Sequence, residues 1–243
     1  MVFDSMWLIA VLIVILASGL QAVTGFGFGL VAVPLFLLIF DAKSAVGLSM
    51  MISFFSVTRL AVNTRKFIIP SLVKNLLSGA LFGIPLGIFI FYHVNMTNLK
   101  FLISIIVILL SSFLISGYRF KVKDSIWVDR IIGSISGVLT SCIGMPGPPI
   151  ILFLNNKELS KDGFRATFAC YNSSVYVPSI IFLFFLGSLH KIIILKALTL
   201  IPFAFLGGFV GSRIFPYVSQ AHFQKGVPIL VLLTAIYSLL STL

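Results

Sequence analysis

Long apolar stretches alternate along this chain with short clusters of charged residues, proline and glycine. Several of these stretches reach the roughly 18 residues at which an apolar run is typical of a membrane-spanning helix. The apolar positions do not recur with a period of two, which is the pattern of a membrane strand. The pattern therefore predicts an all-α polytopic membrane protein.

Ten apolar segments are predicted between the breaks, and two of them are much shorter than the rest. In chain order the segments are Met6–Val23, Leu30–Phe40, Ser44–Ala61, Ser71–Tyr92, Asn98–Gly117, Ile126–Cys142, Pro149–Leu154, Asp162–Gly187, Lys191–Phe215 and His222–Leu243. A helix over Leu30–Phe40 would cover only about 16 Å of a hydrocarbon core that is roughly 30 Å thick. The chain beside Leu30–Phe40 and Pro149–Leu154 is therefore expected to lie within the membrane as well.

The composition assigns the whole chain to the membrane. Of the 243 residues, 59% are hydrophobic and only 9% are charged, whereas about 25% are charged in soluble domains. We expect one membrane domain over residues 1–243, with several passes through the plasma membrane. The start of the chain, Met1–Gly19, lacks the positively charged region that opens a signal peptide, so it is interpreted as part of the first span.

The net charge of +11 comes from Lys and Arg residues in short loops between the apolar segments. They form no continuous basic face to neutralise phosphates, so nucleic-acid binding is excluded. If all ten segments cross the membrane, most of these basic residues share the side of the loop 62–70 and the joint 118–125. If the two short segments are re-entrant, the basic residues divide almost evenly between the two sides of the membrane. The positive-inside rule favours ten crossings, with the basic side cytoplasmic and both termini outside.

The two halves of the sequence resemble each other. "GLQAVTGFGFGLVAVPL" (19–35) and "GVLTSCIGMPGPPIILFL" (137–154) share a span, a Gly/Pro-rich break and a short apolar segment. "GALFGIPLGIFIF" (79–91) parallels "FAFLGGFVGSRIF" (203–215), with glycines in register. We therefore predict a first repeat over 6–117, a cytoplasmic joint over 118–125 and a second repeat over 126–243. Five segments in each repeat make the second lie inverted relative to the first, a plan common in secondary transporters.

The glycines of the first break have a chemical interpretation. Irregular backbone survives at bilayer depth only where protein surrounds it or where it lines a wet cavity. Glycine suits such a segment because it adopts positive φ freely and lets a ligand approach the main chain. The short helix that follows presents unpaired N–H groups and the positive end of its dipole to that cavity, where an anion is the natural occupant. In an inverted repeat, the N-termini of two such half-helices would meet near the bilayer midplane.

Other glycines have a plainer interpretation, because glycine also lets membrane helices pack closely. This packing role is the alternative for either break, and it is favoured for a set of glycines in later helices. At such a packing position, replacement of Gly83 by Ala is expected to be tolerated. The set is Gly79, Gly83, Gly87, Gly207, Gly208 and Gly211.

Two stretches of the sequence resemble a known family. "TGFGFGLVAVPLFLLIFDAKSAVGLSMM" (24–51) is similar to the first-half signature of the TauE/SafE family of sulfite and organosulfonate exporters, including Ala45, Gly47 and Ser49. "GMPGPPIILFL" (144–154) resembles its second-half counterpart. The sequence departs from the family pattern at Phe26 and Phe28, and at Met145-Pro146. The resemblance implies a transporter, an exporter of sulfite or an organosulfonate.

The candidate substrate-binding residues are the breaks and the polar side chains beside them. Superposing the two breaks aligns Ser53 with Asn172, so both are expected to face one cavity. For each Ser or Thr the alternative is a hydrogen bond back to its own helix, and for Gln21 and Asn172 it is a helix–helix hydrogen bond. The full set is Gln21, Thr24, Gly25, Phe26, Gly27, Gly29, Ser49, Ser53, Ser141, Gly144, Met145, Pro146, Gly147, Pro148, Tyr171 and Asn172.

Charged and titratable residues are expected at the ends of the spans. No Asp or Glu lies deep in a predicted span, so a proton relay through a buried carboxylate has no candidate. Coupling to a proton or another ion stays open; the histidines at loop edges are either carriers or ordinary interfacial residues. The arginines at span ends near the breaks either attract anions or extend to lipid headgroups. These residues are His93, His190, His222, Arg59, Arg165 and Arg213.

The sequence does not predict an enzyme. No His, Cys, Asp or Glu residues at depth have the spacing of a metal site or an activated nucleophile, and Cys142 and Cys170 lie singly in apolar segments. We therefore expect no cofactor and no metal. The leading hypothesis is a secondary transporter of a small sulfur-containing anion that uses alternating access around a midplane site. An anion channel, or a transporter of another small organic anion, is the alternative, and the oligomeric state stays open.

Overall fold

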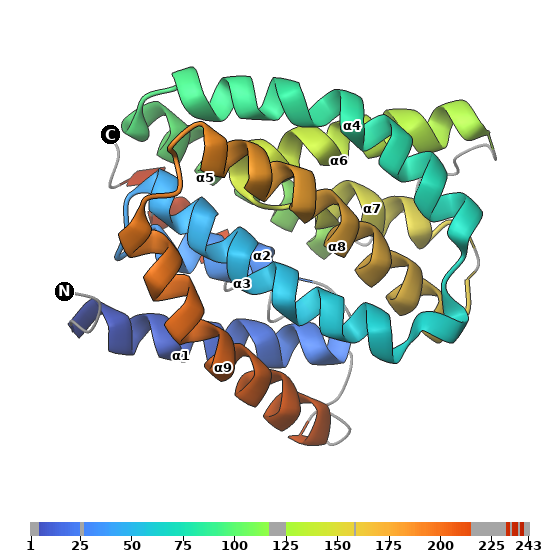
Figure 1. The fold of residues 1–243 in the computed structure, drawn as a ribbon, viewed down its shortest axis with the longest axis horizontal. Helices are drawn as coiled ribbons and strands as arrows, with labels where there is room; N and C mark the ends of the chain where they lie inside the picture. Colours follow the sequence, from blue (N-terminus) through green and yellow to red (C-terminus); the bar gives the residue numbers. More distant parts are fainter. Residues whose placement is uncertain are drawn as a thin grey trace.

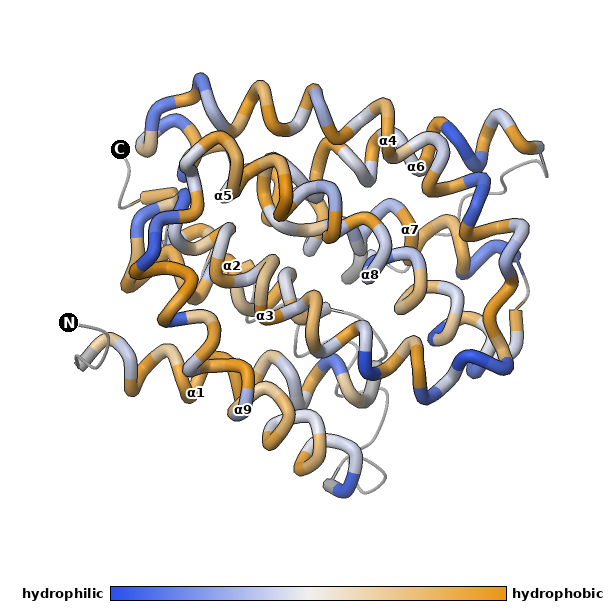
Figure 2. The backbone as a smooth tube through the Cα atoms, in the orientation of Figure 1, coloured by the Kyte–Doolittle hydropathy of each residue, from blue (hydrophilic) through white to orange (hydrophobic). Residues whose placement is uncertain are grey.

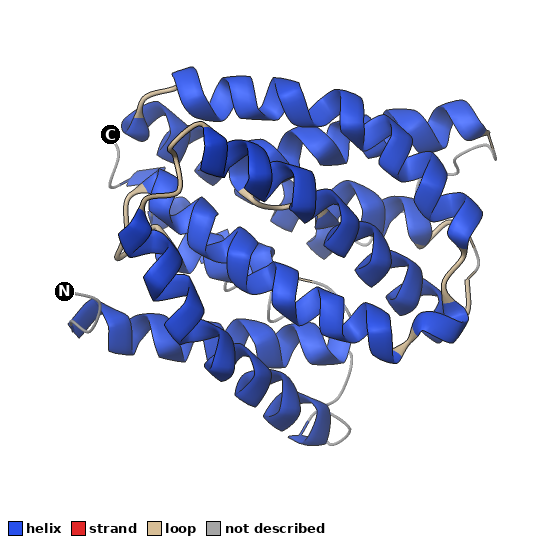
Figure 3. Ribbon diagram, in the orientation of Figure 1, coloured by secondary structure: helices blue, strands red, loops and turns tan. Residues whose placement is uncertain are grey.

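The computed structural model describes residues 5–24, 27–116, 125–157 and 159–214, and seven residues between 232 and 240. Every described element is helical, and no strand occurs in the described part of the chain (Figure 3). The elements are α1 (Ser5–Thr24), α2 (Phe28–Phe36), α3 (Ala42–Asn63), a 3₁₀ turn (Arg65–Phe67), α4 (Pro70–His93), α5 (Met96–Ser116), α6 (Ile126–Ile143), α7 (Gly147–Leu154), α8 (Lys161–Phe185) and α9 (Lys191–Ile214). The predicted all-α class is confirmed.

Six of the described helices are long and apolar enough to cross a membrane: α3, α4, α5, α6, α8 and α9. They agree with the multi-pass membrane protein predicted from the sequence. The two segments predicted to be short are short: α2 has 9 residues and α7 has 8. The last predicted segment, His222–Leu243, and the joint 118–125 lie largely outside the described residues.

Several helices begin where the sequence offers a polar cap. The Asp41 carboxylate accepts a hydrogen bond from the Ser44 N–H at 2.9 Å at the start of α3. The Ser160 hydroxyl accepts from the Gly163 N–H at 3.1 Å at the start of α8. Such caps satisfy N–H groups that the first turn of a helix leaves unpaired. By contrast, neither α2 nor α7 has a side-chain cap at its N-terminus.

The long helices form a bundle around the two short ones (Figure 1). Helix α4 packs along α6, α1 crosses α9, and α3 lies between α8 and α9. Helix α2 is buried along almost its whole length. The hydrophilic residues gather at the helix ends, and the apolar residues fill the middle of the bundle (Figure 2).

The two ends of the bundle differ in charge. One end, where α3 and α7 end and α8 begins, lies at the right in Figure 1; we call it the basic end, after Arg59, Lys157 and Arg165 in or beside these helix termini. At the opposite end, the Lys43 ammonium donates to the Tyr92 carbonyl at 3.2 Å. Helix α7 ends toward the basic end and α2 toward the opposite end, so the two half-helices run apart from the centre (Figure 1). Which end faces the cytoplasm stays a prediction.

Glycines bring the backbones of α4 and α6 into direct contact, and we call this contact the α4–α6 seam. A Cβ on Gly83 would overlap the carbonyl oxygen of Ser134, and one on Gly133 would overlap the carbonyl oxygen of Leu76. Backbone atoms cannot move aside as a flexible side chain can. The prediction that alanine is tolerated at Gly83 is therefore wrong, although the glycine does serve helix packing.

Helices α1 and α9 make a similar glycine contact. A Cβ on Gly207 would overlap the Ile15 carbonyl oxygen, and one on Gly211 would overlap backbone atoms of Gly19. The neighbouring Gly208 differs, because a Cβ there would meet nothing within 4 Å. The packing role predicted for Gly208 is therefore wrong: it faces open space, one position away from the contact face of α9.

Candidate functional site

Both breaks contain a glycine in the left-handed region of the backbone. Gly27, immediately before α2, has φ 97°, and Gly144, immediately after α6, has φ 72°. A Cβ on Gly27 would meet no atom of the described residues within 4 Å, so it is the dihedral angle that requires glycine there. The Gly144 N–H donates to the Thr140 carbonyl at 2.8 Å, which closes the end of α6 before the chain turns into α7.

The two breaks lie against each other in the interior of the bundle. A Cβ on Gly29, in the first turn of α2, would lie 2.8 Å from the Gly144 carbonyl oxygen. The second break is also held by side chains of long helices. The Ser136 hydroxyl of α6 donates to the Pro146 carbonyl at 2.7 Å, and the Tyr176 hydroxyl of α8 donates to the Gly144 carbonyl at 3.4 Å. The N-termini of α2 and α7 therefore open toward one shared space.

That space is a small volume of about 20 Å³, which we call the inner cavity. A cavity needs roughly 10–15 Å³ of such volume to hold one water molecule, so the inner cavity has room for about one. Nine of the residues predicted for the substrate site line it: Gln21, Gly27, Gly29, Ser53, Met145, Pro146, Gly147, Pro148 and Asn172. Both breaks, α3 and α8 thus contribute to a single cavity.

Two buried polar atoms at this cavity have no hydrogen-bond partner among the described residues. The Ser53 hydroxyl and the Asn172 carbonyl oxygen are buried and unpaired, and their residues are 1% and 4% exposed. A buried polar group left unpaired costs about 1–3 kcal/mol. Such groups are uncommon in native interiors, and a bound water or ion is one of the explanations for them. The unpaired groups on α3 and α8 therefore mark the inner cavity as a polar site.

The structure places other predicted residues away from the cavity lining. The Ser141 hydroxyl shares a hydrogen bond of 2.9 Å with Ser179, so it joins α6 to α8. The Tyr171 hydroxyl donates to the Gly133 carbonyl at 3.4 Å, also between these helices. Ser49 is buried behind α2, where its hydroxyl has no partner either. Ser141, Tyr171 and Ser49, together with Gly144, therefore pack around the cavity without lining it.

Gly25 and Phe26 lie outside the described residues, and so does the side chain of Thr24.

Sequence reasoning missed five residues that line the cavity. They are larger apolar or aromatic residues: Phe28, Leu30, Ile151, Phe168 and Tyr176. Tyr176 follows Asn172 by four positions, so both occupy one face of α8, and this spacing is a signal that could have identified it. Phe168 precedes Asn172 by the same spacing. Ile151 follows Gly147 in the same way on α7.

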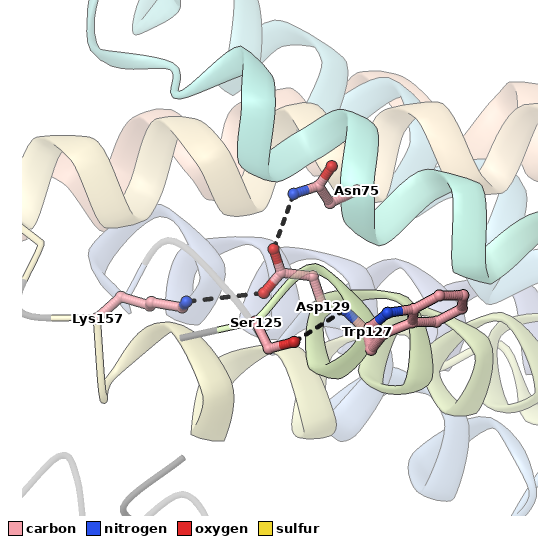
Figure 4. Close-up of polar contacts among 5 residues, drawn as sticks. All are labelled: Asn75, Ser125, Trp127, Asp129 and Lys157. Carbon is pink, nitrogen blue, oxygen red and sulfur yellow. Dashed lines mark hydrogen bonds and ion pairs between the residues drawn. The ribbon is translucent and has the colours of Figure 1, made fainter. Parts of the chain in front are cut away.

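One carboxylate is buried, but at the basic end rather than at the cavity. Asp129, in the first turn of α6, is 5% exposed. Its carboxylate accepts a hydrogen bond from the Asn75 amide at 2.9 Å, and the Lys157 ammonium lies 3.7 Å from its other oxygen (Figure 4). The prediction that Asp129 sits at a segment end holds, but its burial was not predicted. The contacts tie α4, α6 and the chain after α7 together.

The described residues include no group of three or more His, Cys, Asp or Glu that could hold a metal ion. Cys142 and Cys170 are both free thiols. The inner cavity therefore offers neutral hydrogen-bonding groups and helix N-termini, together with aromatic rings, among its described lining.

Comparison with known proteins gives one match. The family model described as "Sulfite exporter TauE/SafE" matches residues 10–238, which is nearly the whole chain of 243 residues. No curated protein and no solved structure matches the chain. The match covers both breaks and all the described helices that surround the inner cavity. The protein is thus a multi-pass membrane protein that belongs to the TauE/SafE family of sulfite exporters.

Proposed function

We propose that this protein is a secondary transporter that exports a small sulfur-containing anion, such as sulfite or an organosulfonate, by alternating access around the inner cavity. The observation that carries the proposal is the meeting of two uncapped half-helix N-termini beside the unpaired Ser53 hydroxyl and Asn172 carbonyl oxygen. Membership of the sulfite exporter family supports the sulfur-containing anion.

The chemistry of the site favours an anion. The first N–H groups of α2 have no partner within the helix, and the positive end of its dipole points into the cavity. Helix α7 adds a second dipole but fewer donors, because Pro148 and Pro149 in its first turn have no N–H. The Ser53 hydroxyl is able to donate to the oxygens of an oxyanion, and so is the Asn172 amide when its nitrogen, rather than its carbonyl oxygen, faces the cavity. Helix α2 is therefore the main source of backbone donors, and the two side chains complete the binding site.

The small volume of the cavity favours a transporter over a channel. Sulfite has four non-hydrogen atoms and does not fit a space with room for about one water molecule. The helices must therefore separate before the site can load, as alternating access requires. A channel, by contrast, needs a pathway that stays continuous while ions move through it.

Counterflow of labelled sulfite in proteoliposomes tests the proposal. Asn172→Leu should lower the flux at least tenfold, because an anion would lose a donor worth roughly 1.5–3 kcal/mol. The same change should leave thermal stability unchanged or slightly higher, since it removes an unpaired buried polar group. Ser141→Ala is the matched control: it breaks the hydrogen bond to Ser179, so stability should fall slightly while flux persists.

Two outcomes would contradict the proposal. If Asn172→Leu carries sulfite at the wild-type rate, the inner cavity is not the substrate site. If the wild-type protein shows sulfite flux without counterflow or saturation, it is a channel. A parallel series with methanesulfonate, acetate and chloride tests whether the site prefers sulfur oxyanions to other small anions.

A further inference from the structure

A second and larger cavity lies at the basic end of the bundle. Its volume is about 190 Å³, and it is bounded by α1, α3, α8 and α9. We call it the vestibule. Its polar lining includes Gln21, Ser56, Arg59, Asn63 and Arg165. The vestibule has ample room for an oxyanion, whereas the inner cavity does not.

The charge of the vestibule is positive and uncompensated. Its described lining contains two arginines and no acidic residue. The Arg165 guanidinium donates to the Ala22 carbonyl at 2.9 Å, while its Nε is buried without a partner. The Arg59 guanidinium lies over the Phe205 ring, 5.2 Å from the ring centroid. Both arginines are thus positioned by neutral groups, which leaves their charge available to an anion.

The vestibule and the inner cavity share one residue. Gln21, near the end of α1, lines both cavities. Its side-chain carbonyl accepts a hydrogen bond of 2.5 Å from the Ser56 hydroxyl of α3. This bond fixes the Gln21 side chain where it lines both spaces.

We infer that the vestibule is a second anion-binding site, for oxyanions of the sulfite and sulfonate type, which loads before the inner cavity opens. The guanidinium group binds planar pairs of oxygens through two parallel hydrogen bonds, and an –SO₃ group offers such pairs. The low dielectric of the cavity walls strengthens this attraction. The identity of the anion rests on the proposed function; the binding site itself rests on the two arginines and the volume.

The test measures charge preference in the vestibule without any transport. Asn63→Cys, in a chain with Cys142 and Cys170 replaced by alanine, is purified in detergent and labelled with methanethiosulfonate reagents of opposite charge. The anionic reagent should react faster than the cationic one, and methanesulfonate should protect the thiol. In the variant that also carries Arg59→Gln and Arg165→Gln, the preference should fall about tenfold and the protection should disappear.

Matched variants separate a binding site from a general surface charge. Arg213→Gln removes a nearby arginine that stacks on Phe209, 4.4 Å from the ring centroid, and is not part of the vestibule lining. It should leave both labelling and protection unchanged. Arg59→Lys with Arg165→Lys should retain the charge preference but weaken protection, because lysine lacks the paired donors.

The labelling result distinguishes failure of this inference from failure of the proposed function. Equal labelling by both reagents in the parent variant, or an unchanged preference after loss of both arginines, would overturn the vestibule site. If labelling behaves as expected but the wild-type protein carries no sulfite in proteoliposomes, the vestibule site stands and the proposed substrate is wrong.

Discussion

Glycine serves two different purposes in two regions of this protein. In the α4–α6 seam, Gly83 and Gly133 are regular helical residues whose missing side chains let two backbones touch. At the breaks, Gly27 and Gly144 have positive φ and reverse the direction of the chain. The seam glycines are required by their neighbours, whereas Gly27 is required only by its own backbone angle. The same amino acid thus supports stability in one region and site geometry in the other.

This difference predicts whether a substitution at each glycine lowers mainly the stability of the protein or mainly its transport activity. A side chain in the seam pushes backbones apart, so it should lower the amount of folded protein. A side chain at Gly27 would meet no described atom within 4 Å but would strain the backbone before α2, so it should act on the substrate site. The following three substitutions test this division, from the largest expected effect to the smallest.

Gly83→Ala should have the largest effect, with a loss of about 3 kcal/mol in stability or failure to fold, because overpacking against rigid backbone costs that much or more. The readout is the amount of monodisperse protein in size-exclusion chromatography, together with the melting temperature in detergent. Gly208→Ala is the matched control, since a Cβ there would meet nothing within 4 Å. Normal folding of Gly83→Ala would mean that the backbones of α4 and α6 can separate.

Gly27→Val should have an intermediate effect on stability, about 1–2 kcal/mol, because a β-branched residue is strained at positive φ. Sulfite flux should nevertheless fall more than tenfold while folded protein is still obtained. Gly27→Asn should retain more flux than Gly27→Val, because asparagine tolerates the left-handed region better than other residues. Wild-type flux in the valine variant would remove Gly27 from the substrate site.

Gly147→Ala should have the smallest effect. A Cβ there would lie 3.3 Å from Cζ of the Phe168 ring, and the edge of a side chain can shift by a few tenths of an ångström. Stability should change by less than about 1 kcal/mol, and sulfite flux should fall only a few-fold as the ring moves into the cavity. A loss of folded protein as large as that of Gly83→Ala would place Gly147 among the packing glycines instead.

The sequence was most informative where one residue determines its own conformation. The two short segments, the breaks and the need for positive φ at Gly27 follow from local chemistry, and they could be predicted. The seam was harder, because whether an added methyl group fits depends on the register of two helices distant in sequence. Gly207 and Gly208 illustrate this: they are adjacent, but only Gly207 lies on the face of α9 that touches α1.

Side-chain roles at the site divide in the same way. Ser53 and Asn172 line the cavity, whereas Ser141 bonds Ser179 across two helices. All three were candidates because they are polar residues within apolar segments. Which of them faces the cavity depends on the rotation of each helix about its axis. The burial of Asp129 depends on Asn75, which α4 brings to it. Local sequence patterns do not predict contacts of this kind between distant segments.

The glycine contacts also constrain how the molecule can change shape. The α4–α6 seam joins a helix of the first half of the chain to one of the second half, and so does the contact of α1 with α9. A motion in which one half tilts as a rigid block against the other would pull apart backbones at both contacts. Sliding or hinging between helix pairs, each drawn from both halves, keeps these contacts whole. The helix pairs that would move as units therefore differ from the two repeats predicted from the sequence.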